Sequence, residues 1–132
     1  MPVLHIGIEN NINETIYMSH FTTDDNDPSH VNHSNYSDKH YIDPMDREAD
    51  VFRIGNFFGF TGSASLFCGD IELGKVEFVM PFSGSNRFNV HSFNRTVNGR
   101  EFNLTQKSYT VHIFHTYVED RYIVVNSTAN RK

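Results

Sequence analysis

The chain has 132 residues and a mass of 15.2 kDa, and it contains 16 acidic residues, 11 basic residues, 12 Phe, 6 Tyr, one Cys and no Trp. This length predicts one domain, 1–132, that is large enough to enclose a hydrophobic core. A single Cys excludes an internal disulfide and a Cys-based metal site. The net charge of −5 argues against a nucleic-acid partner, because neutralising phosphates needs a basic surface.

No segment is apolar for the roughly 20 residues that a membrane-spanning helix needs. Near the start, His5, Glu9 and several Asn occupy the stretch in which a signal peptide is continuously apolar. We therefore expect a soluble protein that is made in the cytoplasm without a signal peptide.

Alternation of apolar and polar residues predicts β-strands along nearly the whole chain. Leu4, Ile6 and Ile8 share one face of the first predicted strand, and helical spacing persists nowhere for more than a turn. In chain order, the predicted strands are 3–9, 14–22, 49–55, 63–72, 74–80, 87–93, 99–104, 108–118 and 121–126. Short strands separated by Gly, Asn and Ser predict an all-β fold, a single-domain antiparallel β-sandwich.

Residues 23–48 interrupt this pattern with a polar, turn-rich sequence that contains six Asp. We expect a long surface loop, or a pair of loops around a short edge strand. His30, His33 and His40 lie in the same segment, and His and Asp are residue types that bind zinc or calcium. Because their spacing matches no metal-binding motif, we predict a solvated loop, with neither a metal nor a cofactor.

Residues 55–62, GNFFGFTG, place Phe57, Phe58 and Phe60 among three Gly. Two structures fit this segment. One is a core strand with bulges, which is the commoner environment of Phe, and the other is an exposed aromatic loop that suits a membrane surface. The residues alone favour the core.

The sequence offers no catalytic motif. There is no G-x-S-x-G turn for a nucleophilic Ser, and the Gly residues of 55–62 do not precede a predicted helix that would bind a phosphate. Cys68 lies in a predicted strand beside Leu66 and Phe67, where an inert buried thiol is expected. We therefore predict that the protein is not an enzyme.

Residues 81–93, PFSGSNRFNVHSF, form the most informative local segment. Pro81 cannot donate to a sheet hydrogen-bond ladder, so it should end the strand before it. We predict a hairpin-like corner between two core strands, with Arg87 and His91 as polar neighbours. The residues of this corner are Pro81, Phe82, Gly84, Ser85 and Asn86.

The same segment resembles a motif of the aegerolysin family, and in particular of the small component of bacterial two-component insecticidal crystal toxins. The family pattern P-F-x-G-S-N, then a basic residue, an aromatic residue and an H-S pair, is matched by Pro81, Phe82, Gly84, Ser85, Asn86, Arg87, Phe88, His91 and Ser92. The opening H-I-x-[VI] strand and its Asn- and Thr-rich turn are matched by His5, Ile6, Ile8, Asn10, Asn11 and Thr15. A glycine-rich approach to a strand is matched by Gly59, Phe60, Thr61 and Gly62.

This resemblance implies an aegerolysin- or actinoporin-like β-sandwich that binds a lipid or receptor on target-cell membranes. It also implies a larger pore-forming partner protein, release from a producing cell in which the protein can accumulate as an inclusion, and compatibility with a homo-oligomer. On this basis we expect Phe57, Phe58, Phe60, Arg87 and His91 to contact the membrane or receptor. Fungal members are rich in Trp, which this chain lacks, so no lipid identity is carried over.

Charge adds an expectation about pH. Residues 82–132 carry 7 basic against 3 acidic residues, whereas residues 1–81 carry 4 basic against 13 acidic residues. Protonation of all 8 His would change the net charge from −5 to +3. We therefore expect membrane binding to strengthen between about pH 7 and pH 5.

Two other functions fit the same composition. Loops rich in Asn, Asp and Tyr on a sandwich also suit a lectin-like carbohydrate-binding module. An inclusion-forming structural protein without a receptor is the third hypothesis.

Overall fold

The computed structural model describes residues 2–24, 39–113 and 116–128, and the side chains of all of these except 2, 50, 108–113 and 116–119. The strands are β1 (Pro2–Asn10), β2 (Ile16–Thr23), β3 (His40–Ile42), β4 (Arg47–Gly55), β5 (Gly59–Cys68), β6 (Ile71–Pro81), β7 (Arg87–Ser92), β8 (Thr96–Val97), β9 (Arg100–Ile113) and β10 (Thr116–Ser127). The described residues contain no helix, and so none that is long and apolar enough to cross a membrane.

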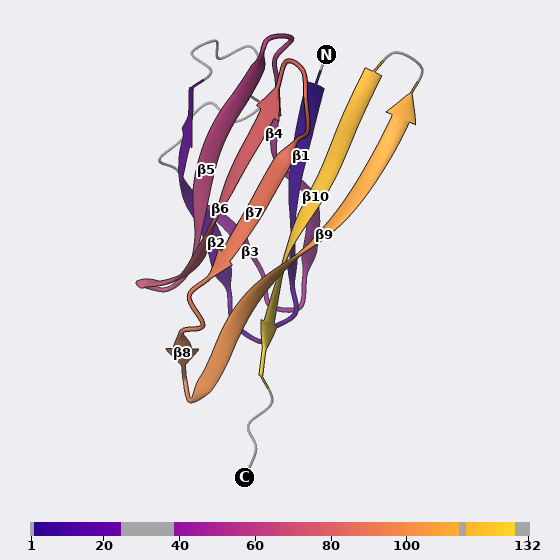
Figure 1. Cartoon of the computed structure of the whole chain (residues 1–132). Helices are drawn as coiled ribbons and strands as arrows, with labels where there is room; N and C mark the ends of the chain where they lie inside the picture. The colour runs from indigo at the N-terminus through magenta and orange to yellow at the C-terminus, as the bar shows by residue number, and fades with distance from the viewer. Residues whose placement is uncertain (1, 25–38, 114–115, 129–132) are drawn as a thin grey trace.

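Two five-stranded sheets form the β-sandwich that the sequence predicts (Figure 1). One has the strand order β4-β1-β10-β9-β8, and the other has the order β3-β2-β5-β6-β7. The predicted antiparallel pairing holds with one exception, because β1 and β10 run parallel to each other. This exception brings the first and last strands of the chain side by side in the middle of one sheet.

The core lies between the sheets and is built by the alternation seen in the sequence. Leu4, Ile6 and Ile8 of β1 are all fully buried, as their shared face predicts. Phe21 of β2 stacks on Phe52 of β4 with ring centroids 3.4 Å apart, which joins the two sheets through an aromatic contact. Most of the buried apolar side chains form one continuous cluster.

The predicted break between the strands 63–72 and 74–80 is misplaced. The sequence places a break at Leu73, but Leu73 is fully buried within β6 and the turn lies at Gly69 and Asp70. Gly69 has a φ of +58°, a conformation that favours Gly and allows Cys68 to pair with Ile71.

The C-terminal hairpin also differs from the prediction. Segments 99–104 and 108–118 were expected as separate strands, but β9 runs without a break from Arg100 to Ile113. β10 begins at Thr116 and pairs with β9 along its whole length. Thr105, Gln106 and Lys107 are consecutive exposed residues of this strand, so β9 is exposed on both faces here and their polarity does not mark a turn.

Within the predicted loop 23–48, β2 extends to Thr23 and β3 forms a short strand at the edge of its sheet. The short edge strand of the second predicted arrangement is therefore present, while residues 25–38 of the predicted loop lie outside the described residues. β4 then begins at Arg47. His30 and His33, which the metal-binding alternative required, lie outside the described residues.

The strands run between two ends of the sandwich. The aromatic end carries the turn between β4 and β5, residues 56–58, and the turn between β6 and β7, residues 82–86. The polar end carries the turn between β1 and β2, residues 11–15, and the β8–β9 hairpin (Figure 1). In Figure 1 the aromatic end lies at the top with the N-terminus, and the polar end lies at the bottom.

Candidate functional site

Three exposed Phe side chains meet at the aromatic end. Phe57 is 55% exposed, Phe58 is 79% exposed and Phe82 is 61% exposed. The ring centroids are 5.3 Å apart for Phe57 and Phe58, 5.4 Å for Phe57 and Phe82, and 6.5 Å for Phe58 and Phe82. Two turns that are 24 residues apart in the sequence, counted from Phe58 to Phe82, thus form one aromatic surface, which we call the Phe cluster.

Local hydrogen bonds and one glycine build the Phe cluster. Asn56 closes the β4–β5 turn, because its side-chain Oδ1 accepts from the Phe58 N–H at 2.9 Å and its carbonyl accepts from the Gly59 N–H at 3.1 Å. Gly59 has a φ of +86° and pairs with Pro81 across the sheet. A Cβ at this position would lie 2.6 Å from the Met80 carbonyl oxygen, so only Gly lets the two turns approach this closely.

The two interpretations of residues 55–62 each hold for part of the segment. Phe57 and Phe58 form an exposed turn, while Phe60 is only 3% exposed and its ring lies 6.0 Å from that of Phe78 in the core. Phe60 was expected at the membrane surface, and the structure corrects this. Phe60 is the second residue of β5, and the alternation of side chains along this strand directs Phe60 between the sheets.

The two remaining expected contact residues, Arg87 and His91, lie on β7, after the predicted corner. Pro81 is the last residue of β6, and Gly84, Ser85 and Asn86 belong to the turn that follows. Arg87 begins β7 as an exposed side chain, beside the same turn. His91 lies four residues further along β7, and its Nε2 is 2.9 Å from Oε1 of Glu77. His91 is therefore engaged on the face of the sheet, away from the Phe cluster.

Sequence reasoning assigned Phe82 only to the structural corner, and it missed its exposure. The preceding Pro81 ends the strand, so Phe82 leaves the alternation that would otherwise set its direction. Pro81 was therefore a sequence signal for the exposure of Phe82. The contact between Phe82 and Phe57, however, depends on strand pairing.

Two further histidines have carboxylate partners. His5 Nδ1 lies 3.2 Å from Asp120 Oδ1, and His40 Nε2 lies 3.0 Å from Glu48 Oε1. No group of three His, Cys, Asp or Glu side chains that would hold a metal ion occurs among the described residues. Stronger membrane binding at lower pH stays a prediction.

Cys68 is a free, buried thiol at the end of β5. Burial raises the pKa of the Cys68 thiol, and the nearby Glu14 carboxylate raises it further. The thiol is therefore protonated at neutral pH, a form that is a poor nucleophile.

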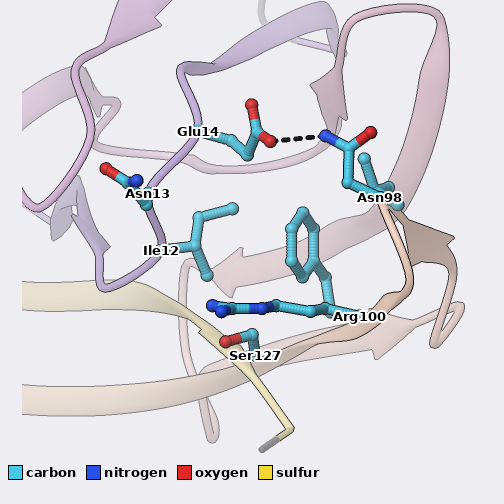
Figure 2. Close-up of a pocket in the computed structure, with 8 residues that line it drawn as sticks. Ile12, Asn13, Glu14, Asn98, Arg100 and Ser127 are labelled. Carbon is cyan, nitrogen blue, oxygen red and sulfur yellow. Dashed lines mark hydrogen bonds between the residues drawn. The ribbon is translucent and has the colours of Figure 1, made fainter. Parts of the chain in front are cut away.

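A second candidate site was not anticipated from the sequence. At the polar end, a pocket lies between the β1–β2 turn and the β8–β9 hairpin (Figure 2). Its polar lining consists of Asn13, Glu14, Asn98, Arg100 and Ser127. The Asn98-Gly99 pair, in which both residues have positive φ, is a known two-residue hairpin signal and is the one sequence feature that marks this place.

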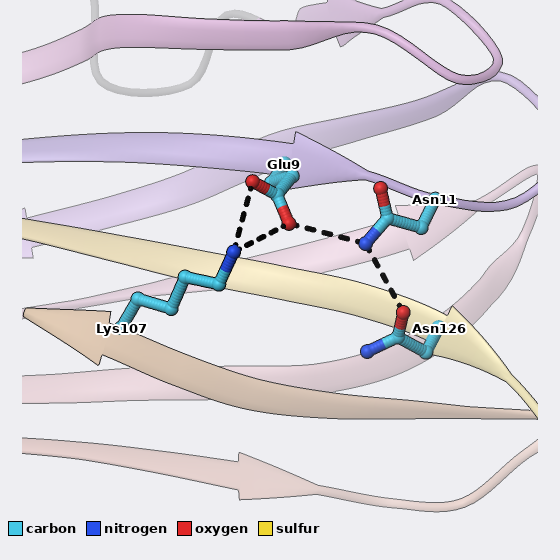
Figure 3. Close-up of polar contacts among 4 residues, drawn as sticks. All are labelled: Glu9, Asn11, Lys107 and Asn126. Carbon is cyan, nitrogen blue, oxygen red and sulfur yellow. Dashed lines mark hydrogen bonds and ion pairs between the residues drawn. The ribbon is translucent and has the colours of Figure 1, made fainter.

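Beside this pocket, a polar network covers the outer face of the sheet (Figure 3). The carboxylate of Glu9 accepts from Asn11 Nδ2 at 3.1 Å and from Lys107 Nζ at 3.1 Å, and Asn11 also donates to Asn126 Oδ1 at 3.1 Å. These hydrogen bonds, first that from Asn11 and then that from Lys107, hold the pKa of Glu9 below its usual value.

The fold and the Phe cluster define an all-β sandwich protein with an exposed aromatic turn surface. A scan against models of protein families finds no match, and a search of curated proteins finds none either. Among solved structures, the crystal structure of IP-1A from Alcaligenes faecalis is similar, with a TM-score of 0.64 and 16% identity. The match covers 97% of this chain and 92% of that chain. At this identity the similarity is one of fold.

Proposed function

We propose that this protein is the membrane-binding component of a toxin, and that it permeabilises target-cell membranes together with a larger pore-forming partner protein. The Phe cluster is the observation that carries the proposal. IP-1A from Alcaligenes faecalis shares the fold at 16% identity, and a β-sandwich is the fold that the toxin hypothesis expects. The motif resemblance to the small component of two-component insecticidal toxins points in the same direction.

The physical argument for membrane contact rests on exposure and position. Three Phe rings are held at the surface by short turns, so they enter the interfacial region of a bilayer without any rearrangement of strands. Burying one Phe side chain stabilises the bound state by about 2 kcal/mol. Arg87, exposed beside the same turns, adds attraction to anionic headgroups.

The same geometry supports the need for a partner. The Phe cluster consists of two turns of a few residues, and a hydrocarbon core about 30 Å thick is far deeper than such turns reach. Binding through this cluster therefore anchors the protein at the interface. We assign the permeabilising step to the larger partner.

Vesicle sedimentation tests the membrane contact. The probes are vesicles of phosphatidylcholine with phosphatidylglycerol and vesicles of insect midgut membranes. Phe58→Ser removes the most exposed ring and is expected to weaken binding about 30-fold, which corresponds to about 2 kcal/mol.

The matched control is Met45→Asn in the turn between β3 and β4, which lies at the polar end because the Met45 N–H donates to the Ile12 carbonyl at 3.1 Å. Met45 is 67% exposed and apolar, and its φ of +61° suits Asn, so this variant removes exposed apolar surface without strain. Vesicle binding should stay at the wild-type level. Equal losses for Phe58→Ser and Met45→Asn would contradict the assignment of binding to the aromatic end.

Dye release tests the partner. The protein alone is expected to bind midgut vesicles without releasing an entrapped dye, and release should appear when a larger protein encoded by a neighbouring gene is added. Full release by this chain alone would contradict the division of roles.

A further inference from the structure

The pocket at the polar end has a size that limits its ligand. Its volume is about 210 Å³, and it is partly open to solvent. Sites for drug-sized ligands occupy about 300–1,000 Å³, so this pocket accommodates one small ring with its substituents. A lipid chain or a folded peptide segment does not fit inside it.

Both charges and several neutral hydrogen-bonding groups line the pocket. Glu14 supplies a carboxylate from the β1–β2 turn, and Arg100 supplies a guanidinium from the first residue of β9. Asn13, Asn98 and Ser127 each add a neutral side chain that both donates and accepts hydrogen bonds. Figure 2 shows Arg100 extended along the pocket between Ile12 and Ser127.

Glu14 is held in place before any ligand arrives. Asn98 Nδ2 donates to Glu14 Oε1 at 2.6 Å across the pocket (Figure 2), and the buried Asn10 side chain donates to the Glu14 carbonyl at 2.9 Å. Within the described part of the chain, no hydrogen bond or ion pair engages the Arg100 guanidinium. The site thus has a fixed acceptor and an available donor, and fixed groups lower the entropic cost of binding.

The charges exclude the simplest ligands. Glu14 would repel an anion such as phosphate, and Arg100 would repel a metal ion, for which a single carboxylate is in any case too few ligands. A neutral ligand whose groups both donate and accept satisfies Glu14 and Arg100 together. Hydroxyl groups have this property.

We infer that the pocket binds a terminal neutral sugar residue of a glycan. Ring hydroxyls donate to Glu14 and accept from Arg100 and the Asn side chains. The C–H groups of the ring contact the apolar floor, to which Ile12 and Phe102 contribute. The open side of the pocket leaves room for the rest of the glycan to extend into solvent.

The position of the pocket determines the source of the sugar. The pocket and the Phe cluster lie at opposite ends of the sandwich (Figure 1). If the aromatic end contacts a bilayer, as we propose above, the pocket faces away from it. A glycoprotein that rises above the membrane therefore presents the sugar, and a glycolipid in the same bilayer does not; this step alone rests on the proposed function.

A glycan array and saturation-transfer NMR with free monosaccharides test the pocket. The array carries soluble glycans with terminal glucose, galactose, mannose, fucose, N-acetylglucosamine or N-acetylgalactosamine. The wild-type protein is expected to bind at least one class of terminal sugar. Arg100→Met and Glu14→Gln are expected to weaken that binding about tenfold or more, because each removes a charge-assisted hydrogen bond.

The two variants and one control separate binding from folding. Glu14→Gln retains the oxygen that accepts from Asn98, so the pocket keeps its shape. Lys107→Met removes a cation from the same strand, outside the pocket, and should leave glycan binding unchanged. Thermal melting checks that every variant is folded.

Three results would overturn the inference. They are the absence of any sugar signal in both assays, sugar binding that neither pocket variant weakens, and binding of free amino acids in place of sugars. A parallel assay distinguishes the source of the sugar, with vesicles of phosphatidylcholine that contain a neutral glycolipid. We expect the protein to bind soluble glycoproteins, and we expect the glycolipid not to increase binding to the vesicles. Arg100→Met should bind midgut lipid extracts as the wild type does, so failure of the glycan site leaves the membrane proposal intact.

Discussion

The two ends of this sandwich are built by different forces. At the aromatic end, two turns approach through the close contact at Gly59 and expose three Phe rings. At the polar end, side-chain hydrogen bonds join turns that are far apart in the sequence, with Asn10 as their centre. The same β-strands therefore present an apolar surface at one end and a hydrogen-bonding pocket at the other, according to the residues in the turns.

Asn10 is the clearest case of a polar side chain that holds turns of the fold together. It is fully buried, it donates to the carbonyls of Glu14 and Asp43 at 2.9 and 3.0 Å, and its Oδ1 accepts from the Ile12 N–H at 3.2 Å. It thereby ties the β1–β2 turn to the β3–β4 turn. At the aromatic end, by contrast, the Asn56 side chain accepts a hydrogen bond within its own turn, from the Phe58 N–H at 2.9 Å.

The largest effect on stability is therefore expected at the polar end. Asn10→Ala leaves buried carbonyl and N–H groups without partners and should lower the free energy of unfolding by about 3 kcal/mol. The neighbouring Asn11→Ala, which removes exposed hydrogen bonds, should cost less than about 1 kcal/mol. Urea denaturation of both variants measures the difference, and similar losses would contradict the structural role of Asn10.

A pair of glycine variants compares the two ends directly. Gly59→Ala combines a positive φ with a clash against backbone atoms of β6, so it should lower the free energy of unfolding by about 2 kcal/mol. Gly99→Ala, with a φ of +78° but open space around its Cβ, should cost about 1 kcal/mol. Equal costs in urea denaturation would mean that close packing does not hold the aromatic end together.

The smallest expected effect is on acid stability, and it belongs to the polar end. The folded-state pKa of Glu9 lies below its unfolded value, so its contribution is present above about pH 4.5 and is lost as the pH falls through the folded-state pKa. Glu9→Gln removes this pH-dependent contribution to the free energy of unfolding. The variant should therefore lose less stability than the wild type between about pH 5 and pH 3.

Thermal melting across this pH range measures the effect. Lys107→Met is the partner control, because it removes one of the two hydrogen bonds that lower the pKa of Glu9 and should give an intermediate slope. A slope for Glu9→Gln that matches the wild type would show that other carboxylates dominate acid unfolding.

Much of the fold follows from local pattern, and the errors have a common cause. The strand at Leu4 to Ile8 is evident because its buried apolar side chains alternate with His5 and Gly7. The turn at Gly69 was misplaced, and β9 was divided, because a polar residue reads alike in a turn and on the solvent face of a strand. Only the pairing partner distinguishes these two environments.

The candidate sites were predictable to different degrees. Phe57 and Phe58 were named from the sequence, because Phe beside Gly and Asn indicates a turn as well as a core. Phe82 was assigned to the corner alone, and the pocket of Glu14 and Arg100 was not found, because each joins segments whose contact is set by strand register.

An all-β chain with a core of alternating apolar residues, and with turns at Gly, Asn and Pro, follows from the sequence, as does the surplus of Phe without Trp. The tertiary structure decided which Phe are buried and which are exposed. It also decided the parallel pairing of β1 with β10 and the meeting of Glu14 with Asn98. The physical reason is that alternation acts over neighbouring residues, whereas pairing between distant strands is selected by burial of the whole core.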